Sequence, residues 1–241
     1  MFLGFDPLYI LIIIVGGLLS AGAAMLVKTH FARASQVPIR SGRSGHQIAE
    51  AILAAEGITD VQVVEHQGFL SDHYNPMTKT LALSPEVYHG RHAAAAGVAA
   101  HEVGHALQHA HNYLPMWARS VLVPVANIGS MIGPLLIIIG IVLAASQKLA
   151  EPHILAYIGV GVFACATLFT VVTVPVEFDA SARARRILGE MGLVREGEEA
   201  DAVRGVLTAA GLTYVAAAIT AILQLLYWAY RAGLIGGGRR E

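Results

Sequence analysis

Charged residues are scarce in this chain, and their scarcity excludes most classes of soluble protein. Only 14% of the 241 residues are Asp, Glu, Lys or Arg, whereas 55% are hydrophobic. Soluble domains usually carry about 25% charged residues. The mean hydropathy of +0.59 points the same way. We therefore expect an integral membrane protein.

The chain also has a single cysteine and no excess of positive charge. The one cysteine, Cys165, lies in an apolar run, so the chain has neither a disulfide framework nor a thiolate zinc site. The net charge of −1 provides no basic surface for nucleic acid. We expect no nucleic-acid partner.

Four apolar stretches are long enough to be membrane spans, at 8–27, 121–146, 154–176 and 206–230. The first resembles a signal peptide, with small residues at 21–23. However, no positive charge precedes it, while Lys28 and Arg33 follow it, which favours an uncleaved helix with its N-terminus outside. The fourth ends in Tyr227, Trp228 and Tyr230, which suit an interfacial anchor.

These spans place segments 28–120 and 177–205 on one side of the membrane. Twelve of the sixteen Lys and Arg residues lie in those segments, so the positive-inside rule places them in the cytoplasm. Four lie on the opposite side: Lys148, Arg231, Arg239 and Arg240. The last three oppose this topology and would fit better if the fourth stretch did not fully cross.

The pattern His101-Glu102-x-x-His105 carries the clearest chemical signal, within a stretch that reads as a helix over 92–109. Helix positions i and i+4 share a face, so both imidazoles can bind one metal ion. Glu102 need not ligate and can take a proton from a metal-bound water. This is the zincin signature of metal-assisted hydrolysis. We predict a single zinc ion, with Glu102 as general base.

A catalytic zinc needs a third protein ligand, and the sequence offers two candidates. His111 has the offset of the metzincin pattern, but Gln108 stands where that pattern requires glycine for a positive φ. Glu177 directly follows the third apolar stretch, where Pro175 predicts a break and a new helix. Two spans return Glu177 to the side that holds the motif, and a carboxylate from a separate helix is the glutamate-zincin solution.

Segments 71–88, 97–109 and 177–181, with the order of the spans, resemble the YugP-type membrane neutral zinc metallopeptidases over nearly the whole chain. That family is distantly related to the prenyl-protease-like and HtpX-like glutamate-zincins. The resemblance implies zinc at His101, His105 and Glu177, with Glu102 catalytic. The prenyl-protease-like pattern has an aspartate four residues after the glutamate ligand. Here that residue is Ser181, a weaker partner, so this relationship is looser.

The expected fold is mainly α, a helical membrane protein with a small α+β zincin-like catalytic region on one side. We expect a transmembrane helix in 1–30, the catalytic region in 31–120, two transmembrane helices in 121–176, a helix with the third ligand in 177–205, a fourth apolar helix, spanning or packed, in 206–231, and a flexible tail in 232–241.

Shorter elements are expected within the catalytic region. A helix over 44–56 stops at Gly57, strands occupy 61–64 and 80–83, a loop covers 68–75, and Ser84-Pro85 opens a helix. The strand at 80–83 could bind an extended peptide by edge addition.

The expected function is membrane-bound zinc endopeptidase activity on peptides or proteins, in a multi-pass protein of a bacterial cytoplasmic membrane that contacts lipid. His73, Tyr74 and Arg183 are candidates for stabilising the oxyanion. The alternative is a non-catalytic metal-binding or scaffold module, in which His109 or His111 closes a four-ligand site. An intact Glu102 disfavours that alternative. A transporter is disfavoured because the spans carry no charges.

Overall fold

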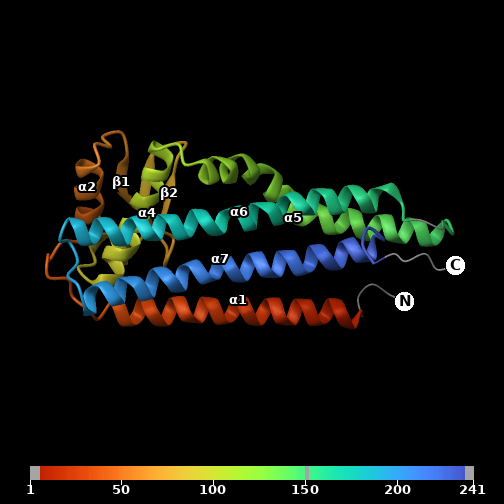
Figure 1. Cartoon of the computed structure of the whole chain (residues 1–241), viewed down its shortest axis with the longest axis horizontal. Helices are drawn as coiled ribbons and strands as arrows, with labels where there is room; N and C mark the ends of the chain where they lie inside the picture. The colour runs from red at the N-terminus through yellow and green to blue at the C-terminus, as the bar shows by residue number, and fades with distance from the viewer. Residues whose placement is uncertain (1–5, 150–151, 237–241) are drawn as a thin grey trace. The chain divides into compact units, whose positions relative to one another are not determined.

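The structure is a computed structural model, and it describes residues 6–149 and 152–236. Within these ranges the chain is mainly helical with one small sheet, as the sequence predicted (Figure 1). In chain order the elements are α1 Pro7–Ala34, α2 Gly45–Ala55, β1 Gln62–Glu65, β2 His73–Asn75, β3 Thr80–Leu83, α3 Pro85–His89, α4 Ala93–Ala110, α5 Leu114–Ser146, α6 Ile154–Glu190 and α7 Glu198–Arg231.

The chain divides into two compact units. The apolar unit consists of the chain up to Ala21, Ala118–Val174 and the chain from Tyr214 onward. The motif unit consists of Gly22–Trp117 and Pro175–Thr213, and it contains every short element, the HExxH pattern and Glu177. Both segments expected to share one side of the membrane therefore contribute to the motif unit.

Among the described residues, four helices are long and apolar enough to cross a membrane: α1, α5, α6 and α7. They contain 28 to 37 residues, and about 20 residues suffice to span a bilayer. Each of the four predicted apolar stretches lies within one of them. The fourth stretch belongs to α7, which is continuous to Arg231 and so has the length to cross completely.

In the apolar unit, side chains of the long helices form a small core around Ile137, Phe163 and Trp228. Near it, Asp6 accepts hydrogen bonds from the Tyr227 hydroxyl, at 3.1 Å, and from the Arg231 guanidinium. Arg231 is one of the charges that opposed the predicted topology, and here it is paired with a carboxylate. Of the predicted tail, 232–236 forms a turn, and 237–241 lies outside the described residues.

In the motif unit, α2 begins and ends as predicted. Ser44 and Gln47 form a capping box at its start. At its end, Gly57 has a φ of +70°, Gly57 N–H donates to Ala54 O, and Ile58 N–H donates to Leu53 O. This is a Schellman motif, whose left-handed residue favours glycine.

The sheet has the strand order β1-β3-β2, with β1 parallel and β2 antiparallel to β3. The strand predicted at 80–83 is confirmed as β3, but its predicted role as an edge is wrong, because β3 pairs on both sides. The loop predicted over 68–75 was also partly wrong, because its last three residues form β2. A three-residue strand has too little alternation to be distinguished from a loop.

Helix α4 is buried along most of its length. Ala93, Ala94, Ala95 and Ala96 are fully buried, and α4 packs against α2, α3 and both β2 and β3. Small side chains allow this many elements to approach one helix. His92 caps the helix by accepting a hydrogen bond from Ala95 N–H at 3.2 Å. The predicted helix over 92–109 is therefore confirmed, and its burial among other elements supports its histidines.

The break predicted at Pro175 is absent, because α6 continues through it to Glu190. A proline removes one helix hydrogen bond, but apolar spanning helices tolerate this loss when threonines and neighbouring helices satisfy the backbone. Glu177 therefore lies inside a long helix, and the expected boundary at 205 lies within α7.

Candidate metal centre

Helix α4 presents His101 and His105 one turn apart. Their rings lie edge to face, with centroids 4.7 Å apart. His105 is buried and the His101 side chain is 12% exposed. The i, i+4 spacing thus places both imidazoles together, as predicted.

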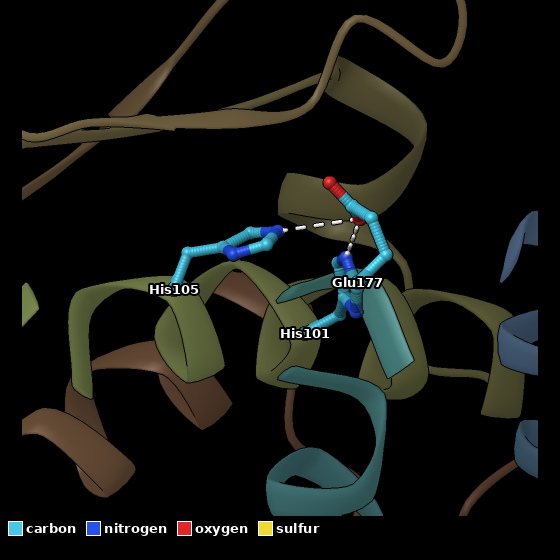
Figure 2. A group of neighbouring side chains, drawn as sticks. All are labelled: His101, His105 and Glu177. Carbon is cyan, nitrogen blue, oxygen red and sulfur yellow. Dashed lines mark hydrogen bonds and ion pairs between the residues drawn. The ribbon is translucent and has the colours of Figure 1, made fainter. Parts of the chain in front are cut away.

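Helix α6 brings Glu177 to the two histidines, although 72 residues separate it from His105. The side chain is only 2% exposed. Its Oε2 lies 3.2 Å from His101 Nε2 and 3.5 Å from His105 Nε2. Figure 2 shows this oxygen between the two rings. Within the part of the chain that the structure describes, these three residues form the group able to hold a metal ion.

A close crossing of α4 and α6 makes this arrangement possible. A Cβ atom placed on Gly104 would lie 2.7 Å from Ala180 O and 3.1 Å from Ala180 Cα. Any side chain here would push the helices apart. Gly104 lies between the two histidines in sequence, and Ala180 lies one turn after Glu177, so this close approach is at the site.

Each imidazole also has a partner at its second nitrogen. His101 Nδ1 is 3.1 Å from Ser181 Oγ, and His105 Nδ1 is 3.0 Å from Gln108 Oε1. Both rings therefore direct Nε2 towards Glu177. The sequence had indicated Ser181 as a weaker partner, but it had presented Gln108 only as a missing glycine. The i+3 spacing of Gln108 from His105 was the available signal.

Two carboxylates influence the charge of His105. Burial disfavours the imidazolium form, but the hydrogen bond with Glu177 and the nearby charge of Glu102 outweigh it, so the pKa of His105 is raised above its ordinary value. Glu102 itself is buried, with 7% of its surface exposed. The site thus concentrates negative charge where a cation would bind.

The other predicted candidates have partners elsewhere. His111 is exposed and forms the C-cap of α4. His73 Nδ1 lies 2.8 Å from Ser71 O, and the Tyr74 hydroxyl lies 2.9 Å from His109 Nδ1. Arg183 Nε donates to Asp179 Oδ2 at 2.6 Å. The structure therefore groups Glu177, not His111, with the two histidines.

Comparison with known proteins identifies the family of the chain. Residues 9–233 match a family model described as "Putative neutral zinc metallopeptidase". The chain belongs to this family. It is also 42% identical over 219 residues to "Putative membrane protease YugP" of Bacillus subtilis (strain 168), an alignment that covers 91% of this chain and 94% of that protein. No solved structure matches the chain.

Membership of the family confirms the resemblance seen in the sequence and implies zinc as the metal. The geometry fits that ion. Tetrahedral zinc binds nitrogen and oxygen ligands at about 2.0–2.2 Å, which places neighbouring donor atoms about 3.3–3.6 Å apart. The two distances to Glu177 Oε2, 3.2 and 3.5 Å, are close to that range. Two imidazoles and one carboxylate are also a donor set found at catalytic zinc sites.

Proposed function

We propose that the chain is a membrane-bound endopeptidase of the glutamate-zincin class, with one zinc ion bound by His101, His105 and Glu177. The observation that carries the proposal is the convergence of Glu177 Oε2 on both histidine Nε2 atoms from a separate helix. Three protein ligands leave one position for water or substrate, as a catalytic site requires and a closed structural site does not.

Glu102 acts as the general acid and base in this proposal. Zinc bound here would supply a water of near-neutral pKa and polarise the substrate carbonyl. Glu102 follows His101 on α4 and is close enough to favour the charged form of His105. The Glu102 carboxylate would take a proton from the attacking water and deliver it to the leaving amine nitrogen. Its burial, with 7% exposed, keeps bulk water from screening the transfer.

The proposal places the motif unit at the cytoplasmic side of the membrane. Glu177 is the first charged residue of α6 and directly follows the uncharged segment 154–176. The substrates of this class are peptides or proteins.

Exchange of Glu102 for Gln tests the mechanism. The variant should retain zinc, because Glu102 is not a ligand, and lose at least about a hundredfold in kcat, the contribution of a positioned base. Purified parent and variant would each be incubated with a peptide library, and new termini identified by mass spectrometry. Glu56→Gln, at the exposed end of α2, is the matched control. Parent-like cleavage by Glu102→Gln would overturn the mechanism.

Metal analysis of alanine variants tests the ligand set. Truncating His105 or Glu177 should remove a ligand and greatly lower the bound zinc per chain. Truncating His111 should leave it unchanged, because His111 is exposed at the end of α4. Loss of zinc from His111→Ala but not from Glu177→Ala would reverse the assignment. If the parent binds zinc but cleaves no peptide, a non-catalytic metal-binding module replaces the enzyme.

A further inference from the structure

We propose that Gln108 is a positioning residue, which holds His105 in its metal-binding tautomer and is itself oriented by Asp179 of α6. The inference rests on the proposed zinc site. Gln108 is fully buried, with 0% exposed, so its amide must be satisfied by protein groups. It lies one turn after His105 and bonds across to α6.

The two groups around its nitrogen fix the orientation of the Gln108 amide. Nε2 lies 2.8 Å from Val176 O and 2.8 Å from Asp179 Oδ2. A carbonyl and an ionised carboxylate only accept hydrogen bonds, so the amide must turn its NH2 group towards them. A flipped amide would set oxygen against both acceptors. Gln108 Oε1 therefore faces His105.

This orientation determines where the His105 proton lies. An amide oxygen only accepts, so His105 Nδ1, 3.0 Å away, must carry the proton and donate it. In neutral imidazole the other nitrogen, Nε2, then has the lone pair. Nε2 is the atom directed at Glu177. Gln108 thus removes the tautomer in which Nε2 would carry hydrogen and could not bind metal.

Asp179 is held in turn by a cation. Arg183 Nε donates to the same Oδ2 atom at 2.6 Å, and the Arg183 guanidinium lies 5.7 Å from the centre of the Tyr113 ring. The Asp179 carboxylate thus supports His105 through the Gln108 amide. Asp179 lies two residues after Glu177 on the same helix. The other histidine, His101, has the Ser181 hydroxyl beside its Nδ1. The support of the two ligands is therefore unequal.

Gln108→Met tests the role by removing both ends of the amide at similar side-chain length. Asp179 keeps Arg183, and Val176 O keeps its place in α6, so folding should survive. Zinc affinity, measured against a competing chelator, should fall about 10- to 100-fold, the usual effect of losing such a partner. Gln36→Met, in an exposed turn, is the control and should bind zinc like the parent.

A charge-conserving exchange separates positioning from packing. Gln108→Glu alone sets a second carboxylate against Asp179 and should also weaken zinc binding. In the double variant Gln108→Glu/Asp179→Asn, residue 108 still accepts a hydrogen bond from His105 Nδ1. The NH2 group of residue 179 can donate to residue 108, and its amide oxygen can accept from Arg183. Part of the lost affinity should return. If residue 108 only fills space, the second exchange restores nothing.

The outcomes distinguish this inference from the proposed function. Parent protein that binds no zinc refutes the proposed metal site. If the parent binds zinc and Gln108→Met binds it as tightly as the Gln36→Met control does, the positioning role is overturned. The proposed metal site then stands. Thermal melting of each variant is recorded first, and if Gln108→Met does not fold, the comparison of Gln108→Glu with the double variant decides.

Discussion

Polar side chains in the motif unit are matched to specific partners, and the half-buried Asp72 is the clearest case outside the metal centre. Its carboxylate accepts hydrogen bonds from Ser84 N–H at 2.7 Å and from Ser84 Oγ at 3.0 Å. Ser84 is the N-cap of α3, but its own hydroxyl makes no cap bond. Asp72 thus joins the loop before β2 to the start of α3.

Asp72→Asn should change how stability depends on pH. Burial raises the pKa of the Asp72 carboxyl more than the Ser84 bonds lower it. The folded state then holds a proton more tightly than the unfolded state, so this group's contribution to stability falls as pH rises from about 4 through the raised pKa. Asparagine keeps the acceptor without the charge. Thermal melting between acid and neutral pH should show a smaller decline for the variant.

Asp72→Ala is the contrasting variant. It leaves the buried Ser84 N–H without its acceptor and should cost about 1–3 kcal/mol at every pH tested. If Asp72→Asn declines with pH as steeply as the parent, the charge of Asp72 is not the cause.

At the level of residues, the sequence predicted the parts of the site that depend on local spacing. His101, Glu102 and His105 follow from one helical turn. Glu177 required a count of spans, because only the topology relates residues so far apart in the chain. The Gln108 contact with Asp179 depends on the angle and register of two crossing helices, which no local pattern encodes.

Among elements, the crossing of α4 and α6 determines the geometry of the site. Gly104→Ala should be destabilising, because its Cβ would press on the Ala180 backbone rather than on a movable side chain. Overpacking of this kind costs about 1–3 kcal/mol, which exceeds the gain of up to about 1 kcal/mol in helix propensity. Displacement of α6 should also move Glu177 and weaken zinc binding. Thermal melting and chelator competition measure the two effects.

Gly189→Ala is the matched control for that exchange. Gly189 also lies in a helix, α6, but a Cβ there meets nothing within 4 Å. Alanine should therefore stabilise the protein by about 0.5–1 kcal/mol and leave zinc affinity unchanged. If the two variants behaved alike, the close contact at Gly104 would not control the site.

The elements that the sequence predicted well have strong local signals. Helix α2 has a capping box and a glycine stop, and β3 is a short apolar run between polar turns. The errors came from tertiary context. Pro175 is a local helix breaker, but the surrounding apolar helix tolerates it. Whether β3 is an edge depends on β2, which joins the sheet from a segment predicted as loop.

At the scale of the whole molecule, the distribution of charge predicts the orientation in the membrane. Twelve of sixteen basic residues lie in the segments 28–120 and 177–205. Of the four others, Arg231 is paired with Asp6 and the Tyr227 hydroxyl. The pairing gives Arg231 a partner at the end of α7, but the rule counts basic residues and not net charge, so Arg231 remains among the four. The distribution of twelve against four favours a cytoplasmic motif unit.

Cysteine labelling tests this orientation directly. In a Cys165→Ala background, one new cysteine would replace Ser41, between α1 and α2, and another, in a separate variant, would replace Gln147, just after α5. Both positions are exposed. In spheroplasts of the expression host, whose cytoplasmic membrane is intact, a membrane-impermeant maleimide should label residue 147 and spare residue 41. The reason is that the charge distribution places only residue 41 in the cytoplasm. After the cells are permeabilised, both should react. Labelling of residue 41 but not of residue 147 in intact cells would place the motif unit outside, while failure of both residues to react before permeabilisation would show that α5 does not cross.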